Sequence, residues 1–326
     1  MIFEKEKLSR SRFTTFGLTI LLAFASAALA VDGTVLINQS TVTTGLTGCP
    51  TGGHFPIIIC QSGSYRLSGN LTVPDANTTA INMTADNVSL DLNGFAILGP
   101  ANCTPGTFPV QCSTTGFGDG IASFRNNISV SNGTISGMGA AGIRLLGFGG
   151  RIDGLRVENN AGVNSSSLSS LGGGVHCIAN CDQYDPEAVA GGIIAVNANI
   201  SNCIAMANAQ HGIYVLGSGM ADRNTVSYNG GFGIVGSVGI INVFFGINGA
   251  LVATNNSVFS NGQDGMNRVA LGVNNTFVAN LGFGFSCAVA TSAPCAFEGN
   301  MFRLNGLNFD QNSTSLGHNF CGGAVC

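Results

Sequence analysis

Beyond residue 30 the sequence contains no lysine and few charged residues of any kind. Eight arginines stand against fourteen acidic residues in that part, for a formal charge of about −6 at neutral pH. This acidic surface argues against nucleic acid and anionic membranes as partners, because both are bound mainly through basic side chains. The same balance makes anionic polymers poor ligands unless calcium ions bridge the charges.

An uninterrupted membrane-spanning run is also missing after residue 30. The apolar stretch at 234–252 is interrupted by glycines and asparagines. At the N-terminus a charged start ends at Arg12, an apolar run covers residues 16–28, and Ala28-Leu29-Ala30 has the small residues of a cleavage site. These features predict a secretory signal peptide over residues 1–30; the alternative, an uncleaved anchor, needs a longer apolar run. We therefore expect export to the periplasm, the cell surface or the extracellular space, without membrane insertion after cleavage.

Helical periodicity is absent, and so are the leucine-rich repeat and the nonapeptide calcium repeat. What recurs instead is a small or turn residue, then glycine, then an apolar residue that opens an extended run. The glycines of these steps are Gly120, Gly142, Gly174, Gly192, Gly212, Gly233, Gly265 and Gly284. Their spacing is near twenty, with two intervals of 32, which predicts a solenoid with insertions at 143–173 and 234–264.

Short stretches between the glycine steps alternate apolar and polar residues. Val88, Leu90 and Leu92 alternate with Ser89 and Asp91, which predicts a strand with one buried face. A similar phrase returns 39 residues later, and we interpret this interval as two turns of the solenoid. Asparagines recur in step with the glycines, and we expect them to stack and to hydrogen-bond from turn to turn. They are Asn208, Asn229, Asn261, Asn280 and Asn305.

Residues 65–94 and the Asn-x-x-x-Gly-Ile steps at 208–213 and 229–234 resemble the secreted right-handed parallel β-helix proteins of the pectate-lyase-like superfamily. The resemblance implies an all-β fold, a right-handed parallel β-helix of about ten coils with disulfide-closed loop insertions. The expected organisation is an N-terminal cap over 31–60, the β-helix over 61–310 and a disulfide-closed C-terminal cap over 311–326. A β-sandwich is the alternative, since counting strands does not separate the two. The superfamily includes lyases, hydrolases, epimerases, adhesins and inactive members, so it implies no particular activity.

Ten of the eleven cysteines fall into close sequential pairs. In an exported chain we expect each pair to close a local loop as a disulfide. The pairs are Cys49/Cys60, Cys103/Cys112, Cys177/Cys181, Cys287/Cys295 and Cys321/Cys326. Cys203 is left over, and we predict a small buried thiol at this position.

We call the eight glycines of the recurring steps the ladder glycines. At the position just before each ladder glycine, no two successive turns carry an ionisable residue. This row reads Asp119, Ala141, Gly173, Gly191, His211, Phe232, Asp264 and Phe283. His211 with Gly212 resembles the histidine element of polygalacturonases, but Gln210 replaces a glycine, and the aspartate pair and Arg-Ile-Lys segment of that family are absent. The aspartate cluster of calcium-dependent pectate lyases and the Asp-Pro-His-Asp signature of alginate epimerases are missing too. His211 is thus a catalytic candidate, although a turn histidine bound to the backbone is the favoured interpretation.

The other candidates lie in the predicted insertion at 172–192: His176, Asp182, Asp185 and Glu187. Three carboxylates within six residues would bind a calcium ion or furnish an acid/base pair. The histidine and its two neighbouring cysteines would suit zinc, but an oxidising compartment favours a disulfide. The simpler interpretation is a solvated acidic loop held by that disulfide.

Two functions from different classes fit these observations. The sequence favours a non-catalytic exported β-helix that binds glycans or another surface protein, or that serves as a scaffold, because the coil pattern is complete while the catalytic patterns are missing. The alternative is a carbohydrate-active enzyme, a polysaccharide lyase or glycoside hydrolase, with its site near 172–192. No cofactor is predicted apart from calcium at Asp182, Asp185 and Glu187.

Overall fold

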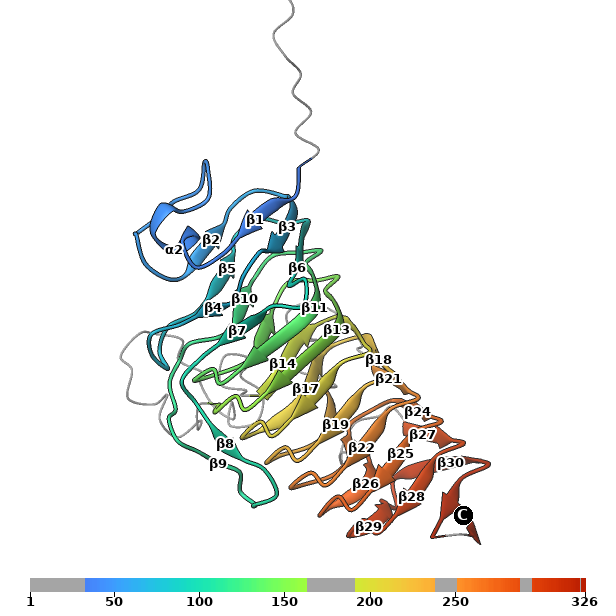
Figure 1. The fold of residues 1–326 in the computed structure, drawn as a ribbon. Helices are drawn as coiled ribbons and strands as arrows, with labels where there is room; N and C mark the ends of the chain where they lie inside the picture. The colour runs from blue at the N-terminus through green and yellow to red at the C-terminus, as the bar shows by residue number, and fades with distance from the viewer. Residues whose placement is uncertain (1–32, 163–190, 238–250, 288–294, 323) are drawn as a thin grey trace, which may run out of the picture. The chain divides into compact units, whose positions relative to one another are not determined.

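The computed structural model describes residues 33–162, 191–237, 251–287, 295–322 and 324–326 (Figure 1). The chain divides into two units, Met1–Gly33 and Thr34–Cys326, and the second contains all the helices and strands of the described ranges. Apart from one short helix, α2 (Thr41–Thr44), these elements are strands. Within the described ranges, no helix has the length and apolarity needed to cross a membrane.

One strand of each coil belongs to a ten-stranded sheet in which all neighbours pair in parallel (Figure 1). The strands are, in spatial order, β2 (Ile57–Ile59), β5 (Ile81–Met83), β10 (Ile121–Ser123), β12 (Ile143–Leu145), β14 (Gly191–Val196), β17 (His211–Leu216), β20 (Ile234–Ser237), β23 (Met266–Asn267), β26 (Phe283–Ser286) and β29 (Leu307–Phe309). Ten rungs confirm the predicted all-β parallel β-helix of about ten coils.

The other two strands of each coil belong to a twenty-stranded sheet made of two columns. The first column contains β1 (Val35–Ile37), β3 (Gly63–Leu67), β6 (Val88–Asp91), β15 (Asn199–Ser201), β18 (Gly219–Asp222), β21 (Leu251–Thr254), β24 (Leu271–Val273), β27 (Cys295–Glu298) and β30 (Ser313–Gly317). The second contains β4 (Leu71–Thr72), β7 (Ala96–Leu98), β16 (Ile204–Met206), β19 (Thr225–Ser227), β22 (Ser257–Phe259), β25 (Thr276–Val278), β28 (Met301–Arg303), β31 (Phe320–Cys321) and β32 (Ala324–Val325). Two longer strands, β11 (Ser129–Ser136) and β13 (Arg151–Glu158), pass through both columns. Parallel pairing thus extends from Val35 to Cys321, beyond the range 61–310 on both sides.

The strand register adds to the repeat seen in the sequence and corrects one interpretation of it. Strand β12 pairs directly with β14 through Ile143 and Ile193, so the steps at Gly142 and Gly192 open neighbouring strands of the ten-stranded sheet. The step at 173–175 lies outside the described residues. Strand β6 pairs directly with β11, so the 39-residue interval is one turn and not two. That turn is long because it carries an antiparallel hairpin of β8 (Cys103–Thr104) and β9 (Gln111–Cys112). Sequence spacing alone cannot separate two turns from one turn with an insertion.

The core is a set of apolar columns that run through the coils. One rung contributes too few apolar atoms to exclude water, whereas stacked rungs bury a continuous column. The column through the ten-stranded sheet includes Ile81, Ile121, Ile143, Ile193, Ile213 and Ile234, all fully buried. In the last coils the core contains buried phenylalanines, and the rings of Phe277 and Phe302 stack with centroids 5.0 Å apart.

Two ladders of asparagines, all buried except the partly exposed Asn305, join the coils at two corners. The first confirms the expected stacking, with Nδ2–Oδ1 distances of 2.9 to 3.0 Å, and comprises Asn160, Asn208, Asn229, Asn261, Asn280 and Asn305. The second was not predicted and comprises Asn224, Asn256, Asn275, Asn300 and Asn319. Cys203 takes the equivalent position one coil before Asn224, donates its N–H to the Asn224 Oδ1 at 2.9 Å and is buried as predicted.

Four of the five expected cysteine pairs form disulfides. They are Cys49–Cys60, Cys103–Cys112, Cys287–Cys295 and Cys321–Cys326. Cys177 and Cys181 lie outside the described residues. The β8–β9 hairpin is closed by one of these bonds, and its buried Val110 lies beside Gly230, several coils further along the β-helix.

Candidate functional site

A row of polar side chains marks the corner between the two columns of the twenty-stranded sheet. From β11 onward each coil turns at this corner on one residue with positive φ, and the residues in this position are Asn132, Gly154, Asn202, Arg223, Asn255, Asn274, Gly299 and His318. Asparagine and glycine adopt this left-handed conformation most readily. The residue before the turn is at least partly exposed in most of these coils, with Asp222 an exception at 7 % exposed. From Asn202 onward, the residue after the turn is Cys203 or an asparagine of the second ladder. We call the residues before the turn, together with the turn residues, the corner row.

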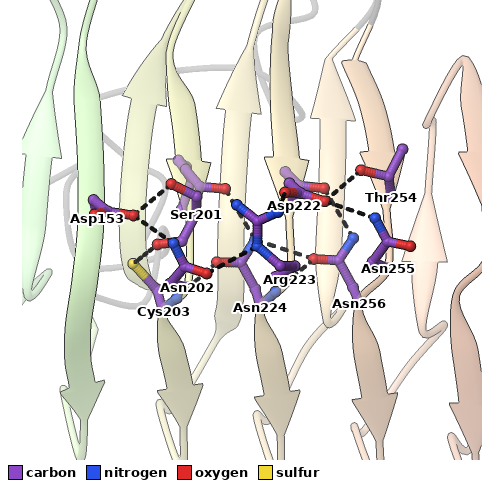
Figure 2. A network of polar contacts seen from close by, with 12 residues as sticks. Asp153, Ser201, Asn202, Cys203, Asp222, Arg223, Asn224, Thr254, Asn255 and Asn256 are labelled. Atoms are coloured by element: carbon purple, nitrogen blue, oxygen red, sulfur yellow. Dashed lines mark hydrogen bonds and ion pairs between the residues drawn. The ribbon is translucent and has the colours of Figure 1, made fainter.

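Two aspartates of the corner row are held in the same way by the following coil (Figure 2). Asp153 Oδ1 accepts hydrogen bonds from Ser201 Oγ at 2.6 Å and from Asn202 Nδ2 at 2.7 Å. Asp222 Oδ1 accepts from the equivalent pair of the next coil, with 2.6 Å to the hydroxyl of Thr254 and 2.9 Å to the amide of Asn255. Each carboxylate is therefore fixed in orientation.

These contacts set the charge of both aspartates. Hydrogen bonds from Ser201 and Asn202 lower the pKa of Asp153 below its ordinary value of 3.8. Burial raises the pKa of Asp222, but the hydrogen bonds from the following coil and the charge of Arg223 together outweigh it, so this pKa also lies below 3.8. Both groups are ionised at neutral pH.

The depressed pKa of Asp222 predicts an acid-dependent loss of stability. Its contribution is complete above the unfolded-state pKa, near about 4, and is lost as the pH falls through the lower folded-state value. Asp222→Asn should therefore lower the melting temperature at pH 6, with the gap to the wild type shrinking below about pH 4. Thermal unfolding by circular dichroism from pH 7 to pH 3 measures this gap. Glu298→Gln, in the same row but 45 % exposed, is the control; an Asp222 gap that persists to pH 3 would contradict the assignment.

Arg223 lies at the centre of the corner row. Its φ of 54° places a long side chain in a conformation that costs about 1 to 2 kcal/mol for a non-glycine residue. Its Nε donates to Asn202 Oδ1 at 3.0 Å, and its Nη1 lies 3.0 Å from Asp222 Oδ2 (Figure 2). The side chain stays 61 % exposed, so guanidinium donors that these two contacts do not use face solvent.

The corner row suits binding better than acid/base catalysis. Asp153 and Asp222 are two strands apart, which corresponds to about 10 Å at the usual strand spacing. A hydrolase pair needs one carboxyl group whose pKa is raised so that it can donate a proton. Here both are lowered, and what the row offers is ionised acceptors, amide groups and an arginine, all suited to hydroxyl-rich ligands.

Sequence reasoning missed the corner row, although a signal for it exists. Four coils share the pattern of an oxygen-bearing residue, a turn residue, and then asparagine or cysteine: residues 201–203, 222–224, 254–256 and 298–300. This pattern lies in a different part of each coil from the residues that precede the ladder glycines. Comparing only those preceding residues from turn to turn therefore does not reveal the corner row.

The structure places His211 at the first position of β17, and not in a turn. Its Nδ1 accepts the backbone N–H of Phe232 at 3.2 Å, and the two rings stack with centroids 5.2 Å apart. Burial lowers the pKa of His211 to about 4, which keeps the ring neutral and able to accept this bond at physiological pH. Gly191 is its partner on β14, so in the described strands no ionisable group neighbours it along that row. A catalytic role for His211 stays a prediction.

The remaining candidates, His176, Asp182, Asp185 and Glu187, lie outside the described residues, and with them the expected calcium site. Within the described ranges, no three histidine, cysteine or acidic side chains gather closely enough to hold a metal ion.

A buried ion pair on the outer face of the ten-stranded sheet was also missed. Asp119 precedes β10, and Arg144 lies on β12; each is less than one-tenth exposed. The Arg144 Nε donates to Asp119 Oδ2 at 2.9 Å, and Asp119 Oδ1 accepts the N–H of Ala141 at 2.9 Å. Asp119 precedes a ladder glycine, whereas Arg144 comes two residues after one. Comparing only the residues that precede these glycines could therefore not predict the ion pair between Asp119 and Arg144.

No protein-family model and no curated protein matches the chain. Among solved structures it is similar to the pectate lyase Pel9A, with a TM-score of 0.55 and 14 % identity over 90 % of this chain and 71 % of that one. It also matches the Dettilon tailspike protein (TM-score 0.43, 17 % identity, 77 % of this chain and 53 % of that one). A third match is the A-module of the Azotobacter vinelandii mannuronan C-5 epimerase AlgE4 (TM-score 0.42, 12 % identity, 78 % and 75 %). At 14 % identity the likeness to Pel9A is one of fold. The ten parallel rungs and this likeness show that the chain has the right-handed parallel β-helix fold.

Proposed function

We propose that this protein is an exported, non-catalytic polysaccharide-binding β-helix that binds its ligand along the corner row. The observation that carries the proposal is the pair of ionised aspartates, Asp153 and Asp222, held at fixed positions on either side of Ser201. Side chains that are ordered before binding lose little entropy when a ligand arrives.

The chemistry of the row favours a neutral, hydroxyl-rich chain. Asp153 Oδ2 takes no part in the hydrogen bonds from Ser201 and Asn202, so it can accept from a ligand hydroxyl group, while Asp222 is 7 % exposed and serves to hold Arg223. The exposed amides of Asn202 and Asn255 both donate and accept. Arg223 adds charged donors, but its ion pair with Asp222 leaves little net charge to attract an anionic polymer. Export is supported by the four disulfides, which persist in oxidising compartments. The final compartment, and a surface protein as a second ligand, stay predictions.

Binding to immobilised polysaccharides tests the proposal. A panel of xylan, β-glucan, galactomannan, polygalacturonate and alginate is to be screened by affinity electrophoresis, with and without calcium. We expect retention by at least one neutral polymer without calcium. Arg223→Gln should weaken that retention about tenfold, because one charged hydrogen bond contributes about 1.4 kcal/mol or more.

Arg303→Gln is the matched control, since Arg303 is an exposed arginine on β28, away from the corner row. Equal loss in both variants would point to general charge rather than to the row. Failure of every neutral polymer to bind would overturn the proposal.

The enzyme alternative has its own readout. Release of unsaturated or reducing ends from any polymer of the panel would replace the non-catalytic proposal by a lyase or hydrolase. A triple variant of Asp182, Asp185 and Glu187 to alanine then tests the insertion as the site, since unchanged activity would exclude it.

A further inference from the structure

A cavity of about 440 Å³ opens beside the N-terminal coil, far along the chain from the corner row. It lies between the segment that carries α2 and the turn that follows β4. Its volume falls in the range of small-molecule sites.

The walls of this cavity are tied to the β-helix. The side chain of Gln39 pairs with the backbone of β4 like an added strand: its Nε2 donates to the Thr72 carbonyl at 3.2 Å, and its Oε1 accepts the Thr72 N–H at 2.9 Å. The opposite wall comes from the loop of His54 and Phe55, which the disulfide Cys49–Cys60 closes. Both walls are therefore held in place without a ligand.

The lining combines an apolar floor with a few polar groups. Val42, Phe55 and Pro74 supply the apolar part, and the hydroxyl groups of Thr72 and Thr78 supply polar atoms. The Thr78 hydroxyl already donates to Asp75 Oδ1 at 2.9 Å, so its lone pairs are left to accept. The lining includes no carboxylate, lysine or arginine.

His54 completes the polar rim of the cavity. Its Nδ1 lies 2.6 Å from the carbonyl oxygen of Phe55, which can only accept, so Nδ1 carries a proton in this contact, and in the neutral ring Nε2 is then the acceptor nitrogen. An apolar floor facing a rim of hydroxyl groups and an imidazole suits a sugar ring, which has C–H groups on its faces and hydroxyls at its edge.

We propose that this cavity is a second glycan site that binds one neutral sugar unit, with the ring face on Phe55 and Pro74 and the hydroxyls toward Thr72, Thr78 and His54. The absence of ionised groups from the lining selects a neutral unit over a uronate. The proposal rests on the proposed function, in that a polysaccharide is the natural source of such a unit.

Saturation-transfer NMR with the methyl glycosides of glucose, galactose and mannose, and with methyl galacturonate as the anionic comparator, tests this site. We expect at least one neutral glycoside to bind with a millimolar Kd, and the uronate to bind at least tenfold more weakly. His54→Ala and Thr72→Val should each weaken binding about threefold or more. Both side chains are exposed, so the fold should tolerate these changes.

Thr104→Val, at an exposed threonine of the β8–β9 hairpin outside both the cavity and the corner row, is the matched control and should change nothing. Arg223→Gln should lower polymer retention but leave the glycoside signal intact, which separates this site from the corner row. Equal binding of uronate and neutral glycosides, full binding by His54→Ala, or no binding of any neutral glycoside up to about 20 mM would each overturn the inference.

Discussion

Asn229→Ala is expected to lower the free energy of unfolding by about 4 kcal/mol. The Asn229 side chain is fully buried and makes four hydrogen bonds. Its Oδ1 accepts from the N–H and the Nδ2 of Asn208, and its Nδ2 donates to Ala205 O and to Asn261 Oδ1. Alanine would leave these partners unpaired inside the helix, at about 1 to 3 kcal/mol for each group that water cannot reach.

The effect is measured as the shift of the urea unfolding midpoint, followed by far-ultraviolet circular dichroism. Hydrogen exchange of the Asn208 N–H gives a local readout, because Asn229 Oδ1 is its acceptor at 3.1 Å. Asn305→Ala is the matched control: it ends the same ladder, is partly exposed and accepts from Asn280 on one side only. Equal destabilisation by both variants would show that the buried amide chain is not the cause.

Arg144→Met is expected to cost about 3 to 5 kcal/mol, because it leaves the Asp119 carboxylate buried without its charge partner. Asp119 is 7 % exposed, and its Oδ1 would keep the hydrogen bond from the backbone N–H of Ala141. Methionine retains most of the length and apolar packing of the arginine stem, so the loss reports mainly the charge.

The double variant Asp119→Asn/Arg144→Met makes this test specific. Asparagine still offers Oδ1 to the Ala141 N–H but carries no charge, so the double variant should recover most of the stability lost by Arg144→Met. Chemical denaturation of the wild type, both single variants and the double variant gives the coupling energy. A double variant as unstable as the sum of the two singles would mean that the two side chains act independently.

Much of the fold could be predicted from spacing. The glycine step followed by an apolar residue marks the strands of the ten-stranded sheet, since glycine is required where coils stack closely. A Cβ on Gly233 would lie 2.6 Å from the carbonyl oxygen of Gly265 in the next coil. The asparagine ladder was predictable for the same reason, because identical positions in successive coils come into register. Local cysteine pairs were readable because the bonded residues are at most 11 apart in the sequence.

The site residues were harder to predict because their partners come from different coils. Asp153 is held by residues 48 and 49 positions later, and Asp222 by residues 32 and 33 positions later. These separations differ because insertions of different length fall between the coils. A fixed repeat length applied to the sequence therefore aligns residues of successive coils that do not contact each other.

The sequence by itself determined the class of fold, the strand-forming repeat and the first asparagine ladder, because identical positions in successive coils recur at a nearly constant spacing. The tertiary structure alone decided which strands pair across an insertion, where the chain turns between the two columns of the twenty-stranded sheet, and which charges meet. Asp119 and Arg144 are the clearest case: only the direct pairing of β10 with β12 brings them together. The corner row follows the same logic, since contacts between coils depend on the length of chain inserted between them and not on the repeat itself.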